Sequence, residues 1–170
     1  NIIMKFKLLL ALLFMGTATT YAEQVVVQTR GISLVLNVEN GSKPKYVYFG
    51  SRLNAADLKS LSVPEGGRMD AYPAYGMNCP AEAALAMRHS DGNMSTELVA
   101  TGVSRRSEGN AMVTTIHLKD PVYNIKVNLY YRAYNDVDMI EAWTDVKNDE
   151  RGTVTLTEFE SAMLPIRRGD

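Results

Sequence analysis

The sequence contains one cysteine, Cys79, among 170 residues. An intramolecular disulfide is therefore excluded, and the hydrophobic core has to be stable without a covalent cross-link. A charge imbalance is also missing, because 18 basic and 19 acidic side chains leave a formal net charge of -1. This balance favours neither a nucleic-acid partner nor an anionic membrane surface, and we expect neither.

Several signatures of enzymes are missing as well. The two histidines, His89 and His117, have no further ligand at the spacing of a metal site. We expect His89 to hold the turn at Asp91 and His117 to face solvent. No glycine-rich phosphate loop or serine-hydrolase elbow occurs, and Cys79 has no base near it in the sequence. We therefore expect no metal, no cofactor and no catalytic residue in this chain.

The N-terminus has a short hydrophobic run. Leu8 to Met15 is too short to span a bilayer. Lys5 and Lys7 precede it, and Thr20-Tyr21-Ala22 supplies a small-x-small cleavage site, the arrangement of a secretory signal peptide. We expect residues 1–22 to be removed and the mature chain to be exported, to the periplasm or out of the cell.

Short runs of alternating apolar and polar residues follow. Ile32 to Val38 has an apolar side chain at every second position, which predicts a half-buried strand. Val122 to Tyr134 and Met139 to Val146 show the same period. The other predicted strands are 24–27, 45–50, 81–87, 96–104, 111–119 and 153–161. Because strand and helix patterns do not alternate, we expect an all-β, largely antiparallel sandwich.

Two pairings are predicted from turn residues. Ala81 to Met87 has a helix-forming composition. The reversal signal Ser90-Asp91-Gly92-Asn93 follows it at once and favours a strand that turns back as a hairpin, which is the interpretation adopted. Asn148 to Gly152 is expected to close another hairpin, between 139–146 and 153–161.

One long irregular region, Ser51 to Pro80, interrupts the strands. Asn54 to Leu61 is expected to form about two helical turns within it. An irregular stretch of this length in a compact domain is usually functional. Its aromatic side chains, Tyr72 and Tyr75, are therefore candidates for contact with a ligand or with another subunit.

Four motifs occur in order along the chain. They are Tyr48-Phe49-Gly50-x-Arg52-Leu53, Tyr72-Pro73-x-Tyr75-Gly76, Ala84-Leu85-x-x-Arg88-His89-x-Asp91-Gly92-Asn93, and the strand pair Leu129 to Glu141 with Asp136-x-Asp138 at its turn. Over roughly Ile32 to Pro165 they resemble the N-terminal domain of family 36 glycoside hydrolases, the retaining α-galactosidases.

The resemblance implies a super-sandwich of the galactose-mutarotase type with one long irregular loop. After the expected signal peptide (1–22), it implies an N-terminal β-sandwich domain (23–165) and the start of a linker (166–170) to a catalytic (β/α) barrel. In the family, the catalytic aspartates lie in that barrel, so this chain alone is expected to be inactive. The parent enzyme would hydrolyse terminal α-galactosides as a homo-oligomer.

The same resemblance gives the candidate site. The family commonly has Gly-Asp-Phe-Arg after the Tyr-Gly pair, where this chain has Asn78-Cys79-Pro80-Ala81. The acidic and the basic side chain are both absent. We expect Tyr72, Tyr75, Asn78 and Cys79 to lie at the rim of a substrate pocket or at a subunit interface, with Cys79 in place of the family's acidic residue.

Other candidate residues have a structural explanation. Asp136 and Asp138 suggest the carboxylate pair of a retaining glycosidase. They flank a tight reversal between strands, where aspartate commonly binds nearby backbone, so a structural role is expected. Trp143 lies within a predicted strand and is expected to pack in the core or against another domain.

Two further interpretations stay open. A free-standing exported carbohydrate-binding module would bind sugars without an attached enzyme, and would lose affinity when Tyr72 and Tyr75 are changed to alanine. A purely structural or adhesion β-sandwich would neither bind sugar nor precede a barrel.

Overall fold

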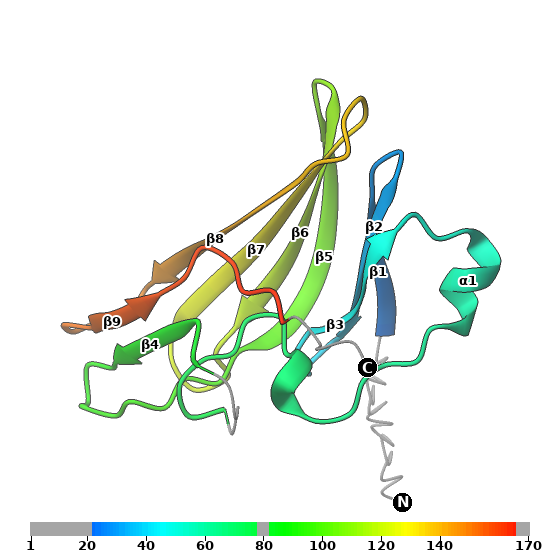
Figure 1. Cartoon of the computed structure of the whole chain (residues 1–170). Coiled ribbons are helices and arrows are strands. Elements are labelled where there is room, and N and C mark those ends of the chain that lie inside the picture. Colours follow the sequence, from blue (N-terminus) through cyan, green and yellow to red (C-terminus); the bar gives the residue numbers. More distant parts are fainter. Residues whose placement is uncertain (1–21, 78–81, 166–170) are drawn as a thin grey trace, which may run out of the picture.

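The computed structural model describes residues 22–77 and 82–165, which form three antiparallel sheets (Figure 1). The first sheet contains β1 (Ala22–Gln28), β2 (Ile32–Glu39) and β3 (Lys45–Ser51), in that order. The largest contains β5 (Val99–Glu108), β6 (Ala111–Lys119), β7 (Ile125–Tyr134) and β8 (Ile140–Asn148), also in order, and the third pairs β4 (Leu85–Arg88) with β9 (Thr155–Phe159). The helical elements are α1 (Ala55–Ser60) and a 3-10 helix (Gly67–Met69). The predicted all-β antiparallel fold is confirmed.

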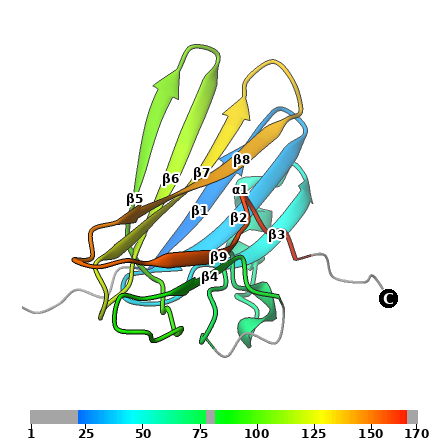
Figure 2. The same ribbon diagram turned by 90° about the vertical axis from the view of Figure 1, so that its left-hand side faces the viewer.

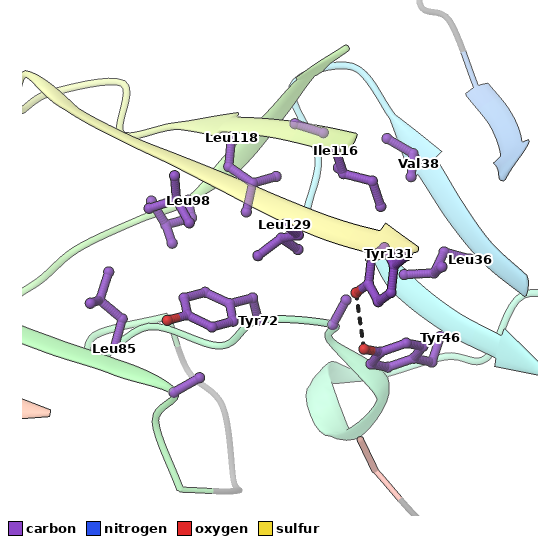
Figure 3. Close-up of a cluster of buried hydrophobic side chains, with 14 of the residues drawn as sticks. Leu36, Val38, Tyr46, Tyr72, Leu85, Leu98, Ile116, Leu118, Leu129 and Tyr131 are labelled. Atoms are coloured by element: carbon purple, nitrogen blue, oxygen red, sulfur yellow. Dashed lines mark hydrogen bonds between the residues drawn. The ribbon is translucent and has the colours of Figure 1, made fainter. Parts of the chain in front are cut away.

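The core lies between the three-stranded and the four-stranded sheet, which form two layers in Figure 1. β7 shows how the sequence builds it: Ile125, Val127, Leu129 and Tyr131 alternate with more exposed residues, and each is at most 3% exposed. Leu36 and Val38 of β2 face them from the opposite layer (Figure 3). The alternation in Val122 to Tyr134 therefore predicted the buried face of this strand correctly.

β2 is buried on both faces, and not on one face as its alternation predicted. Ser33 and Val35 are fully buried although they point away from the core cluster. The reason is the segment after β3, which carries α1 and lies on the outer side of this sheet (Figure 1). Its backbone is bound there, since Leu53 N donates to Ser33 Oγ at 2.9 Å and Leu58 O accepts from Gln24 Nε2 at 2.9 Å.

The short helix α1 confirms the two helical turns expected in this region. Asn54 is its N-cap, with a side-chain oxygen that accepts from the backbone N–H groups of Ala56 and Asp57. The Asp57 carboxylate accepts in return from Asn54 N, which completes a capping box. This cap explains why a helix forms at that point of an otherwise irregular stretch.

The predicted hairpin through residues 148–152 is wrong. β9 does not pair with β8 but with β4, beside which it lies in Figure 2. In this pairing Leu85 is opposite Phe159. The turn is held beside β4 because the Glu150 carboxylate accepts from the N–H and hydroxyl groups of Ser90. Gly152 packs so closely on Ser90 that a Cβ atom there would lie 2.6 Å from the serine Cβ.

The region around β4 also departs from expectation. The strand covers only Leu85–Arg88, and Ala84 N and Leu85 N both donate to Pro73 O of the preceding loop. The turn at 90–93 forms, but β5 begins only at Val99, so the two strands around the turn are not a hairpin. Among the described residues, no helix is long and apolar enough to cross a bilayer.

Candidate functional site

The candidate loop begins at a buried tyrosine. The ring of Tyr72 is 3% exposed and lies in the core near Leu85 and Leu129 (Figure 3). Its hydroxyl donates to Glu160 O at 2.8 Å, and burial raises the pKa of the phenol. Tyr72 therefore anchors the loop and offers no ring face to a ligand at the surface. The predicted contact with a ligand or another subunit can come only from the residues that follow Tyr72.

Tyr75 has the opposite environment, with 52% of its surface exposed. Its backbone is fixed from two sides, because Tyr75 N donates to Leu85 O and Tyr75 O accepts from Thr96 N, both at 2.9 Å. The turn closes with a hydrogen bond from Met77 N to Ala74 O at 3.2 Å. The loop is thus an ordered turn that presents a tyrosine side chain to solvent.

Gly76 allows this turn to pack tightly. Its φ angle is +94°, a backbone conformation that residues with a Cβ atom rarely adopt. A Cβ atom there would also lie 2.7 Å from Ser95 Cβ and 2.8 Å from Ser95 Cα. On the far side of the turn, the Lys43 ammonium donates to Met77 O. Asn78 and Cys79, the other two predicted rim residues, lie outside the described residues.

Of the Asp136–Asp138 pair, Asp138 has the structural role expected for it, although its partners are not nearby in sequence. Asp138 Oδ1 accepts from Thr29 Oγ1 at 2.8 Å and from Gly31 N at 2.6 Å. The hydrogen bonds from Thr29 and Gly31 lower the pKa of the Asp138 carboxyl. The carboxylate therefore joins the β7–β8 connection to the β1–β2 connection across the two layers.

His89 is buried and does hold the turn that follows β4. His89 N donates to Asn93 O, Nδ1 lies 2.7 Å from Glu150 Oε1, and Nε2 lies 2.9 Å from Thr96 Oγ1. The ring of Tyr123 stacks on the imidazole with centroids 3.5 Å apart. Every polar atom of His89 has a structural partner, and the described residues contain no group of side chains arranged to hold a metal ion.

Trp143 lies on the outer face of the four-stranded sheet and not among the core residues, so core packing, the first of the two environments predicted for it, is wrong. Packing against another domain, the second, stays a prediction. Strand alternation points the indole away from the core cluster, against the parallel ring of Tyr130, with centroids 4.9 Å apart. The Arg132 guanidinium lies 5.0 Å from the indole centroid. His117 belongs to the same face, half-buried, with hydrogen bonds to Asn128 and Ser104.

Two neighbouring features had no signal in the sequence. A groove of about 370 Å³ opens beside the β2–β3 connection, lined in part by Glu39, Lys43, Lys45 and Glu97. Close to these lysines, Asp70 is 3% exposed, and neither of its carboxylate oxygens has a hydrogen-bond partner in the described part of the chain. Only the folded arrangement brings this carboxyl group and the two lysines together.

Comparison with solved structures shows the same fold in three α-galactosidases. The family 36 α-galactosidase AgaA from Geobacillus stearothermophilus superposes with a TM-score of 0.68 at 17% identity, over 82% of this chain and 24% of that one. The α-galactosidase of Lactobacillus brevis gives 0.67 at 14% identity, over 82% and 23%. The galactosidase domain of the α-galactosidase–sucrose kinase AgaSK gives 0.70 at 18% identity, over 84% and 25%.

The chain thus spans about a quarter of the length of these enzymes. No curated protein matches its sequence. The sequence profile of the glycosyl hydrolase family 36 N-terminal domain matches residues 42–170, which is most of the chain and includes the Tyr72–Met77 turn and all strands from β3 onward. The chain therefore belongs to the N-terminal domain family of family 36 glycosyl hydrolases.

Proposed function

We propose that this chain is the non-catalytic N-terminal part of an exported α-galactosidase that hydrolyses terminal α-galactosides. Its own task is to brace the catalytic barrel and to lend the loop at Tyr75 to the rim of the active site or to a subunit interface of a homo-oligomer. The observation that carries the proposal is the family match over residues 42–170. The solved α-galactosidases compared above share this fold, and this chain covers only about a quarter of each.

The loop has the properties that a contact at a pocket rim requires. Tyr75 is exposed while its backbone is bound on both sides, so little conformational entropy remains to be lost when the ring meets a sugar. The flat face of a tyrosine packs well on the C–H face of a pyranose, and its hydroxyl is a further hydrogen-bonding group. This turn also carries the Tyr-Gly pair of the motif.

A bracing role requires apolar surface. β9 is exposed along its whole length, with Leu156 at 51% and Phe159 at 43%, and Leu164 follows at 42%. Exposed apolar patches of this kind usually mark an interface. We assign this surface to contact with the catalytic part of the same polypeptide.

The test of the loop uses the full-length enzyme and an oligosaccharide α-galactoside. We expect Tyr75→Ala to lower kcat/KM about tenfold, the loss that one stacking contact of about 1.4 kcal/mol produces. Phe49→Ala is the matched control, because Phe49 is an aromatic residue of similar exposure, 54%, on β3. Equal kinetics of the Tyr75 and Phe49 variants would contradict a role of the loop at the active site.

The test of the non-catalytic role uses the chain alone. We expect no turnover of an aryl α-galactoside, because the family's catalytic aspartates belong to the barrel. Turnover that disappears in Asp138→Asn would contradict the proposal. The coding sequence after Asp170 provides a second check: we expect it to continue into alternating strands and helices with aspartates at strand ends.

Export is proposed from the signal-like segment at residues 1–22, which lies almost entirely outside the described part of the chain. Sequencing the N-terminus of the mature protein tests it, with Glu23 as the expected first residue. An uncleaved protein that stays in the cytoplasm would refute export without affecting the assignment as a bracing domain.

Carbohydrate binding without an enzyme is the second candidate, and the exposed Tyr75 is the observation in its favour. It predicts measurable sugar affinity for the isolated chain, which calorimetric titration with galactose and raffinose would detect. The bracing-domain proposal predicts little or no affinity in the same titration, because most of the pocket would be built by the barrel.

A further inference from the structure

Two lysines, Lys43 in the β2–β3 connection and Lys45 at the start of β3, hold two different stretches of the irregular region. The Lys43 ammonium donates to Met77 O, at the end of the turn that presents Tyr75. The Lys45 ammonium donates to Pro64 O at 3.2 Å, on the stretch between α1 and the 3-10 helix. Lys43 thus acts directly on the backbone of the candidate loop, whereas Lys45 does not.

Asp70 lies close enough to these lysines to interact electrostatically with both, but its carboxylate has no hydrogen-bond partner among the described residues. Its backbone forms a bridge with Lys45, and the next residue, Ala71, donates its N–H to Pro44 O at 2.8 Å, so its position next to β3 is fixed. Both carboxylate oxygens are buried and accept no hydrogen bond from any described residue. A buried carboxylate without a partner is costly, and an ammonium group is the natural partner to relieve that cost.

We propose that Lys43 is a positioning residue for the Tyr75 turn and that Asp70 is its alternative partner. A charged Asp70 draws the Lys43 ammonium away from Met77 O, whereas a protonated Asp70 leaves the ammonium on the loop. The turn then alternates between a bound and a released state according to the protonation of one buried carboxyl group. The two states of the turn do not depend on the proposed function of the loop. Only the effect of these states on activity rests on that proposed function.

The electrostatics of the surroundings fit this competition. Burial raises the pKa of Asp70, and the positive charges of Lys43 and Lys45 oppose that rise. The other charged groups nearby are Arg68, exposed on the 3-10 helix, and two carboxylates, Glu39 and Glu97, that line the groove with both lysines. Lys43 itself lines the groove, so its side chain borders open space.

Amide hydrogen exchange at Met77 N–H, which donates to Ala74 O, reports the state of the turn. It is measured in the full-length protein at about pH 4 and about pH 9, the span in which buried carboxyl groups titrate. After correction for intrinsic exchange, we expect wild-type protection to fall about tenfold at the higher pH, as for loss of one charge-assisted hydrogen bond. Asp70→Asn should keep high protection at both values.

The lysine variants separate positioning from general stability. Lys43→Gln should lower protection at both pH values, Lys43→Arg should restore it, and Lys45→Gln should keep the wild-type pH dependence because its contact lies elsewhere. Equal wild-type protection at both pH values, or a pH dependence that persists in Asp70→Asn, would overturn the proposal. Because no sugar enters this measurement, its result is independent of whether Tyr75 contacts substrate.

Discussion

Gly76→Ala tests the tight packing of the candidate turn. A residue with a side chain at φ +94° carries about 1–2 kcal/mol of backbone strain. The new Cβ would also lie 2.7 Å from Ser95 Cβ and 2.8 Å from Ser95 Cα. Since the Cα atom can move only with the backbone, this overlap adds about 1–3 kcal/mol. We expect Gly76→Ala to lower the free energy of unfolding by about 2–5 kcal/mol.

The matched control is Gly92→Ala. Gly92 has nearly the same φ angle, +89°, but a Cβ atom there would meet no atom within 4 Å. This variant should therefore show the strain alone, about 1–2 kcal/mol. Urea unfolding followed by circular dichroism measures both values. Equal destabilisation by the two substitutions would refute the claim that contact with Ser95 constrains the turn.

Three other predictions concern the core and its polar contacts. The hydroxyl groups of Tyr46 and Tyr131 are buried and 3.0 Å apart (Figure 3), so either single change to phenylalanine should cost about 1–3 kcal/mol and the double change less than the sum, as a double-mutant cycle in urea would show. Burial acts to raise the pKa of Glu150, but hydrogen bonds from His89 and Ser90 outweigh it and lower that pKa. Its contribution to stability is therefore complete above the unfolded-state pKa and is lost as pH falls through the folded-state pKa, so Glu150→Gln should flatten the acid limb of the stability profile. The pKa of Asp138 is also lowered, so Asp138→Asn should destabilise the protein at neutral pH, and its melting temperature should approach that of the wild type in acid. Thermal melts at several pH values would measure both effects.

Local patterns predicted the strands well because burial of one face imposes a period of two. In β7, the alternation of Ile125, Val127, Leu129 and Tyr131 was enough to identify the buried face. The same rule placed Trp143 opposite the inward face of β8. The expectation of packing in the core or against another domain followed the general preference of aromatic residues, and the structure excludes the core, as the period indicated.

Pairing between distant strands was not predictable from turn residues. The connection after β8 looks like a hairpin turn in sequence, yet Glu150 is bound by His89 and Ser90, about sixty residues earlier. This contact brings β9 beside β4. Nothing near residue 150 in the sequence indicates which distant backbone it will reach, so the third sheet could be found only in the folded chain.

The different roles of Tyr72 and Tyr75 were not predictable either, because they also depend on contacts with distant parts of the chain. Tyr72 and Tyr75 are equivalent in a sequence motif, but the fold buries the first at 3% and leaves the second at 52% exposure. Tyr72 is fixed by the core and by Glu160 O, which lies at the far end of the chain. Because one tyrosine anchors the loop, the other can be exposed on an ordered backbone. A recognition residue gains from this arrangement, since folding has already ordered the backbone that binding would otherwise have to order.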